Sequence, residues 1–512
     1  MINENASFFI LTRGGIADPG QEADFAAIEA RLAKPSAKLL VHLHGGLVDE
    51  KAGLAAATRL AGRGSGSWDR DDQWTQIYVI WRTGAIETLA TNWADLAHND
   101  RLYQALLSKL IRFVARRLGI PTSGGARSIG ETFALDEVEV RRLIVGDGND
   151  AERGDPFSAI EPHFTPAASE GARATILETV SPLTLANAFE VELGGDQEFL
   201  LAAASLDAAV NAGLPGRDAA RDGDPVEGAR LYGNLSASIK AQIGSVGASP
   251  QAKARGLFAT ASMLIKHGGR IAWRCFERFR TQRDHGFHAT LVEELCRELY
   301  GDIVGATIWG MMTRDAAEHF ETQGFGTSLL GILSRIPRLE RFILSGHSAG
   351  SIWAAHMLLA MQKAGIDQPA RLSLLAPAIR QDLFAQMIAT AEPLISSCHM
   401  AAMDDVHERK DALLGSNRGY IYPHSLLYCV SGLFENNGKH PYPDAPILGM
   451  RRFGDAHWMN REERKDAKAI ADFFARPGNA VMLTPKSGVS NAISHGSFDD
   501  DPLTLSSVAE LF

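Results

Sequence analysis

The chain contains a series of short apolar runs, each closed by a glycine or a polar turn and separated from the next by a helical pattern. Runs of roughly four to eight apolar residues bounded by turns are typical of strands buried on both faces. Strands that alternate with helices indicate a parallel sheet covered on both sides. We therefore predict an α/β fold with a mostly parallel sheet flanked by helices. The predicted strands are 6–11, 38–44, 76–81, 341–345, 371–375, 397–403 and 479–483.

The middle of the chain has a different character. Between residues 121 and 284 strand signals are sparse, Gly, Asp, Ala and Pro are frequent, and helical patterns appear near 198–212 and 252–267. We predict a large, mainly helical insertion or cap there. It divides the α/β core into a first part, 1–120, and a second part, 285–512. Within the second part, we interpret 420–475 as a candidate lid segment.

Composition excludes several classes of protein. Of 512 residues, 45% are hydrophobic and 22% are charged, which is ordinary for a globular chain and rules out collagen, coiled coil and wholesale disorder. The net charge of -10 argues against bulk binding of nucleic acid. The four cysteines form no CxxC pair, so neither a zinc ribbon nor a disulfide scaffold is expected.

The N-terminus has no basic region, and its apolar run is too short for a secretory signal. No stretch approaches the ~20 apolar residues that cross a bilayer. We expect a cytoplasmic protein without a transmembrane segment. The sequence leaves its oligomeric state open.

The strongest motif is Gly346-His347-Ser348-Ala349-Gly350. It fits G-x-S-x-G and lies between a predicted strand and a predicted helix. Small residues two before and two after the serine relieve the crowding of such a tight strand-to-helix turn. The backbone N–H groups at the helix N-terminus favour negative charge beside the serine. The pattern predicts Ser348 as a nucleophile; a plain glycine-rich turn is the alternative.

A serine hydroxyl needs a base to become a good nucleophile. In this topology the base follows the last strand, and His495 lies in a loop there. His457 is a rival, and a solvent-exposed loop histidine is the alternative interpretation.

The acid that orients the base should follow the strand at 397–403. The segment after it carries three aspartates and a glutamate, in a charge run that is also typical of a solvated loop. We prefer Asp411, because it opens a short apolar run that can return toward the sheet, and Asp405 is the second choice. Asp404 and Glu408 stay open.

Acyl transfer also needs N–H donors for the developing oxyanion. The amide of Ala349 directly follows the nucleophile. The loop at 44–47 follows an earlier strand, and its glycines let the backbone approach a substrate closely. We predict the amides of Gly46 and Leu47 as further donors, although a simple tight turn has the same pattern.

The order of these motifs along the chain resembles that of the α/β-hydrolase superfamily, in particular its lipases and esterases. The order is the His44-Gly45-Gly46 loop, the Ser348 turn, the acid and then His495. The matching segments, 36–90, 338–411 and 478–498, make up under a third of the chain. The resemblance implies a serine hydrolase that cleaves a carboxylic or lipid ester through an acyl-enzyme, with no cofactor or metal. The long insertion and the long stretch after Asp411 depart from a minimal member.

Two other functions remain open. His42 and His44 lie on the same side of a predicted strand, so both imidazoles would reach one metal ion in a metal-dependent hydrolase. A non-catalytic scaffold that retains the fold is the other alternative.

Overall fold

The structure is a computed structural model, and it describes most of the chain. The described residues are 6–46, 48–62, 68, 74–81, 86–118, 140, 144, 180–212, 224–248, 257–415, 418–419, 421–435, 444–454 and 456–510.

An eight-stranded sheet forms the centre of the fold, in the order β2-β1-β4-β3-β5-β6-β7-β8. All neighbouring strands run parallel except β1 and β2, which are antiparallel. The α/β class with a mostly parallel sheet is therefore confirmed, and the two-residue strand β2 is the one that the sequence did not predict. The strands are β1 (Ser7–Arg13), β2 (Ile16–Ala17), β3 (Lys38–Leu43), β4 (Trp74–Trp81), β5 (Arg341–His347), β6 (Ala370–Leu375), β7 (Ile395–Met403) and β8 (Ala480–Thr484).

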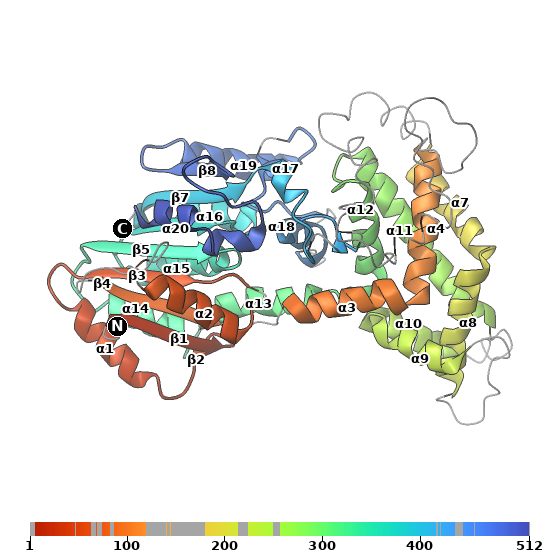
Figure 1. Cartoon of the computed structure of the whole chain (residues 1–512), viewed down its shortest axis with the longest axis horizontal. Helices are drawn as coiled ribbons and strands as arrows, with labels where there is room; N and C mark the ends of the chain where they lie inside the picture. Colours follow the sequence, from red (N-terminus) through yellow and green to blue (C-terminus); the bar gives the residue numbers. More distant parts are fainter. Residues whose placement is uncertain are drawn as a thin grey trace.

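Helices cover both faces of the sheet (Figure 1). One face carries the larger core, in which alternate strand residues such as Val41 and Leu344 belong to one apolar cluster with residues of many helices. Among these helices are α1 (Glu22–Leu32), α14 (Phe325–Leu333), α15 (Gly350–Ala364), α16 (Gln381–Ala391) and α19 (Arg461–Phe474). The opposite face, with Leu40 and Ile343, packs against α2 (Glu50–Ala61) and α20 (Pro502–Ala509). Because successive strand residues point to opposite faces, each central strand contributes to both cores.

The order of the strands reverses between β3 and β5. The chain leaves β3 through α2 on one face of the sheet and leaves β5 through α15 on the other face. The two loops therefore diverge at the carboxyl ends of adjacent strands. In open parallel sheets this is where ligands bind.

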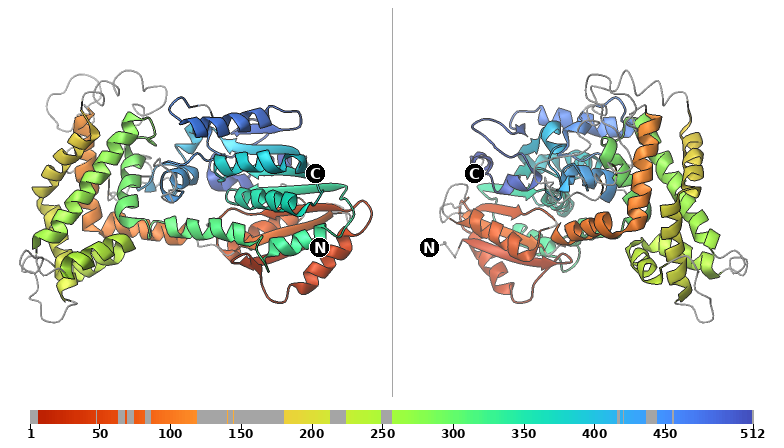
Figure 2. Two further views of the ribbon diagram at one scale, coloured as in Figure 1. Left: turned by 180° about the vertical axis from the view of Figure 1, so that it is seen from behind. Right: turned by 45° about the vertical axis from the view of Figure 1, so that its right-hand side comes forward.

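A helical assembly stands beside the sheet (Figures 1 and 2). Its described helices are α4 (Arg101–Arg117), α7 (Pro182–Gly194), α8 (Gln197–Ala212), α9 (Pro225–Asn234), α10 (Ala237–Ala248), α11 (Leu257–Arg280) and α12 (Phe287–Leu295). Both α3 (Ile86–Asn99) and α13 (Ala306–Glu318) lead from the sheet toward it (Figure 1). The described part of 121–284 consists mainly of helices. Since α4 and α12 pack with these helices from outside the predicted limits, the division into domains stays a prediction.

Buried ion pairs join the candidate lid segment to the helical assembly. Arg278 lies 2.7 Å from Glu293, which also accepts a hydrogen bond of 2.7 Å from the hydroxyl of Tyr422. Arg283 pairs with Asp444 at 2.5 Å. All five side chains are buried, where a charge is tolerated only if it is paired and hydrogen-bonded. These contacts join Tyr422 to α12 and Asp444 to the loop between α11 and α12.

The apolar run at 425–434 forms α18 (Leu426–Cys429) followed by a π-helical turn, η8 (Val430–Phe434). The four cysteines are buried and form no disulfide. Among the described residues, no helix has both the length and the apolar character that a membrane span requires.

Candidate active site

Ser348 lies in a strained turn between β5 and α15. Its φ of 51° is in the left-handed region that non-glycine residues rarely adopt. A Cβ on Gly346 would lie 2.6 Å from the backbone of Gly350, and a Cβ on Gly350 would lie 2.7 Å from the carbonyl oxygen of Leu43. Both contacts are too short for any side chain, so the turn requires glycine at both positions. Strain of this kind is common where a residue is held for function.

The backbone of Ser348 is held on both sides. Its N–H donates to the carbonyl oxygen of Leu375 at 2.8 Å, and its carbonyl oxygen accepts from the N–H of Ala378 at 3.0 Å. These bonds tie the turn to the end of β6. The backbone from which the Ser348 side chain projects is consequently held at the carboxyl edge of the sheet, next to the N-terminus of α15.

His495 contacts this serine. It opens a short 3-10 helix, η10 (His495–Asp499), after β8, and its Nε2 lies 2.8 Å from Oγ of Ser348. Burial lowers the pKa of His495 to about 3, so the ring is neutral near pH 7. A neutral imidazole can accept the hydroxyl proton through Nε2. The structure thus brings together the nucleophile and the base that the sequence indicates.

Asp411 reaches the same residue through the backbone. Its Oδ2 accepts a hydrogen bond of 2.7 Å from the main-chain N–H of His495. The ring Nδ1 of His495 is buried and has no hydrogen-bond partner among the described residues. Burial raises the pKa of Asp411 to about 6, while the hydrogen bond from His495 acts against this rise. The carboxylate therefore lies beside the histidine but does not hold its ring in this conformation.

The other carboxylates of this segment have separate partners. Asp404 caps the short helix α17 (Asp405–Glu408) and lies 2.8 Å from Nδ1 of His407. Asp405 accepts from the hydroxyl of Tyr428 at 2.7 Å. Of the carboxylates after β7 that the sequence offered, Asp411 is the one bonded to His495.

Glu408 is fully buried and accepts a hydrogen bond from the hydroxyl of Ser425. Burial raises the pKa of this carboxyl well above its usual range. His457, the rival for the base, has an exposed side chain.

The loop after β3 lies over the nucleophile. A Cβ on Gly45 would lie 3.4 Å from Cβ of Ser348, and a Cβ on Gly46 would lie 3.1 Å from Cβ of Ala349. Neither the amide of Gly46 nor that of Ala349 donates to another described backbone group outside its own helix or strand. Both amides therefore stay candidate donors to an oxyanion. Leu47, the third predicted donor, lies outside the described residues.

Helix α13 closes the site from above, which the sequence did not predict. A Cβ on Gly46 would lie only 1.8 Å from Sδ of Met312, so this methionine packs directly on the loop. Met312 and Ser348 are each 1% exposed. Further along α13, Trp309 stacks on Phe434 of η8. Met312 therefore covers Gly46, and methionine is the most adaptable of the apolar side chains.

His42 in β3 and His44, directly after it, have different partners. Nδ1 of His42 lies 3.0 Å from Oγ of Ser345, and Nδ1 of His44 lies 2.6 Å from the carbonyl oxygen of Gly45. Burial lowers their pKa to about 3 and about 4. No three His, Cys, Asp or Glu side chains of the described ranges are grouped in a way that would hold a metal ion. A metal centre at His42 and His44 therefore gains no support from the described geometry.

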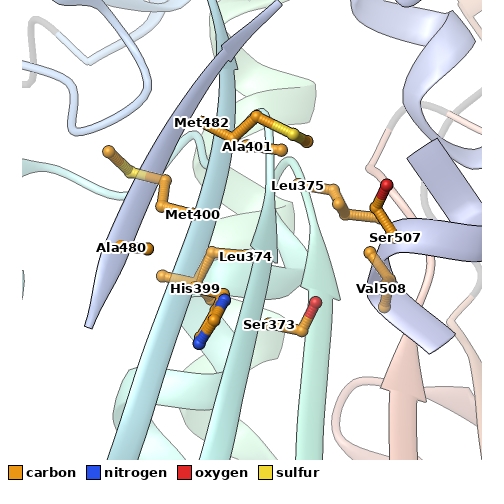
Figure 3. Close-up of a pocket in the computed structure, with 10 residues that line it drawn as sticks. All are labelled: Ser373, Leu374, Leu375, His399, Met400, Ala401, Ala480, Met482, Ser507 and Val508. Atoms are coloured by element: carbon orange, nitrogen blue, oxygen red, sulfur yellow. The ribbon is translucent and has the colours of Figure 1, made fainter. Parts of the chain in front are cut away.

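A small cavity of about 80 Å³ lies elsewhere, between α20 and the sheet face formed by β6, β7 and β8 (Figure 3). It is lined mainly by apolar side chains, and Met400, Met482 and Val508 are among them. None of the candidate catalytic residues lines it, so it is separate from the site at Ser348.

Comparisons with protein-family models, with curated proteins and with solved structures found no match.

Proposed function

We propose that this protein is a serine hydrolase that cleaves an ester through an acyl-enzyme intermediate. The observation that carries the proposal is the 2.8 Å contact between Oγ of Ser348 and Nε2 of His495. A buried serine in a strained strand-to-helix turn, in contact with a neutral imidazole, has the two groups that nucleophilic catalysis requires.

An α/β-hydrolase-like fold is part of the proposal. Ser348 follows β5, Asp411 lies beyond β7 and His495 lies beyond β8, which is the order Ser, Asp, His of that fold. Because these strands are parallel, their carboxyl ends share one edge of the sheet. Three residues far apart in the sequence thereby lie close together.

In the proposed reaction, Oγ of Ser348 attacks the ester carbonyl carbon while Nε2 of His495 takes the hydroxyl proton. His495 then gives this proton to the leaving alkoxide, and the acyl group remains on Ser348. Water, deprotonated by His495, attacks the acyl-enzyme and releases the acid. The amides of Gly46 and Ala349 would stabilise the negative oxygen of both tetrahedral intermediates.

Asp411 would orient the imidazole and stabilise its protonated form. Its carboxylate already bonds to the backbone N–H of His495 at 2.7 Å, and the ring Nδ1 of His495 has no partner in the described structure. Catalytic hydrogen bonds are often incomplete before substrate binds and tighten afterwards. We propose that Asp411 accepts from Nδ1 when the ring becomes an imidazolium.

We propose a carboxylic or lipid ester as the substrate. Met312, Trp309 and Phe434 supply apolar surface above the oxyanion loop and along α13. An acyl chain that displaces Met312 would enter an apolar environment.

The experiment is hydrolysis of p-nitrophenyl esters of graded chain length by the full chain and by its Ser348→Ala variant. Loss of the nucleophile costs about six powers of ten in turnover in enzymes of this type. Activity that survives in the alanine variant but disappears with a chelator would favour a metal-dependent hydrolase. Wild-type protein without any activity toward these esters or a fluorophosphonate would favour a non-catalytic scaffold.

A further inference from the structure

The imidazole of His347 lies against the imidazole of His495. His347 is the last residue of β5, directly before Ser348, and it is 4% exposed. The two ring centroids are 5.3 Å apart, with 30° between the ring planes. The residue before the nucleophile therefore contacts the proposed base.

Both ring nitrogens of His347 face an acceptor. Nε2 donates to the backbone carbonyl oxygen of His495 at 3.1 Å. Nδ1 lies 3.5 Å from Oδ2 of Asp499. Because a neutral imidazole has a single N–H, only the charged ring serves the carbonyl and the carboxylate together.

The electrostatics of the pair favour the charged ring. Burial lowers the pKa of His347, but Asp499, the carbonyl oxygen of His495 and Asp500 together raise it above the usual value. Burial likewise raises the pKa of Asp499, but His347 outweighs it and lowers that pKa to about 2. The other titratable groups that act on these two come from β3, α2 and η10: His42, His44, Arg59, His495 and Asp500.

Asp499 is anchored by helix α2. Nη2 of Arg59, on α2, donates to the carbonyl oxygen of Asp499 at 2.8 Å and pairs with Asp500 at 2.5 Å. Gly45 leaves room for the ring, since a Cβ there would lie 3.0 Å from Nδ1 of His347. The pair is thus held by its surroundings on both sides.

We propose that His347, whose ring lies between Asp499 and the carbonyl oxygen of His495, is a positioning residue that fixes the backbone of His495 relative to Ser348. The inference rests on the proposed hydrolase function. The backbone of His495 is then held at its N–H by Asp411 and at its carbonyl by His347. The turn that carries the nucleophile thereby also sets the location of the base, and a displacement of about 1 Å in such a site costs about 100-fold in rate.

Two amide variants of the full chain separate positioning from simple loss of charge. In His347→Gln the side-chain nitrogen reaches about as far as Nε2 and can still donate to the carbonyl of His495. In His347→Asn it reaches only about as far as Nδ1. Both variants remove the ion pair with Asp499, so each serves as the control for the other.

The measurement is the second-order rate constant for labelling of Ser348 by a small alkyl fluorophosphonate. We expect His347→Asn to react about 100-fold more slowly than wild type. His347→Gln should react at least about tenfold faster than His347→Asn. Thermal unfolding of the two variants should be similar. Equal rates for the two variants, or no loss in either, overturn the inference.

If both amide variants fail to fold, Asp499→Asn tests the same relationship without changing the turn. Without the carboxylate the His347 ring carries one proton and donates to one acceptor at a time, so labelling should slow by about tenfold. An unchanged rate overturns the inference. If wild-type protein reacts no faster than Ser348→Ala, both the proposed function and this inference are overturned. If wild type reacts and the His347 variants are labelled at the same rate as wild type, only the inference is overturned.

Discussion

Nε2 of His495 lies 2.8 Å from Oγ of Ser348, although 147 positions separate the two residues in the chain. The contact forms because β5 and β8 are parallel strands of one sheet, so that the turn after one and the loop after the other reach the same edge. The following predictions depend on this contact and on the groups around it.

The base is identified by comparing His495→Ala with His457→Ala. Base and nucleophile act as a unit, so His495→Ala should lose about six powers of ten in turnover, as Ser348→Ala should. His457 is exposed, and its replacement should leave turnover within a few-fold of wild type. An inactive His457→Ala beside an active His495→Ala would show that the base is misassigned.

The acid is identified by Asp411→Asn, with Asp404→Asn and Asp405→Asn as controls. An amide in place of the orienting carboxylate should cost about four powers of ten in turnover, because it stabilises the wrong imidazole tautomer. The controls bond to His407 and Tyr428 and should stay within a few-fold of wild type. Unfolding curves must show that each variant is folded. A folded, fully active Asp411→Asn would remove Asp411 from the account.

The activity should fall on the acid side near pH 6. The pKa of Asp411 is raised to about 6, whereas that of His495 is lowered to about 3, so Asp411 takes up a proton first as the pH falls. A protonated carboxyl cannot stabilise the imidazolium, and the labelling rate of Ser348 should drop about tenfold per pH unit below 6. The residual labelling rate of Asp411→Asn should not decrease in this way below pH 6. If it does decrease, another titrating group causes the decrease.

The same pKa shift has a consequence for stability. A carboxyl whose pKa is raised by folding is unfavourable when ionised, so its effect appears as the pH rises from about 4, the unfolded value, through about 6. Across this window the free energy of unfolding of wild type should decrease relative to that of Asp411→Asn. Urea unfolding at pH 4 and pH 7 measures it, and parallel changes in both proteins would contradict the assigned shift.

The glycine requirement of the turn is tested by Gly346→Ala. The added Cβ would lie 2.6 Å from the backbone of Gly350, which cannot yield as a flexible side chain would, so we expect a loss of about 1–3 kcal/mol in stability. Gly244→Ala in α10 is the matched control, because its Cβ meets nothing within 4 Å. That change should stabilise the protein by about 0.5–1 kcal/mol. Equal effects of the two changes would contradict the geometry of the turn.

Much of the sheet could be predicted from the sequence because its strands are buried runs with clear limits. The run 38–44 corresponds to β3 and the run 397–403 to β7. Strand β2 was missed because two residues carry no periodic signal. The limits of the helical assembly could not be predicted in the same way, because α4 has the same amphipathic pattern whether it packs on a sheet or on α8.

The candidate site could be predicted where it depends on the order of elements, and not where it depends on side-chain packing. Ser348 and His495 follow from the positions of the strands. The choice of Asp411 over Asp405 depends on which carboxylate turns toward His495, and a charge run does not encode this. Neither Met312 above Gly46 nor the pair of His347 with Asp499 has a sequence signal, because each is a contact between distant elements.

The most direct test of the central claim is mass spectrometry of the full chain after reaction with a fluorophosphonate. We expect a single phosphonyl adduct on the peptide of wild type that carries Ser348, and no adduct on Ser348→Ala. In His495→Ala the adduct should form several orders of magnitude more slowly. No adduct on wild type, or an adduct on another residue that persists in Ser348→Ala, would contradict the claim that Ser348 and His495 form the reactive pair of a serine hydrolase.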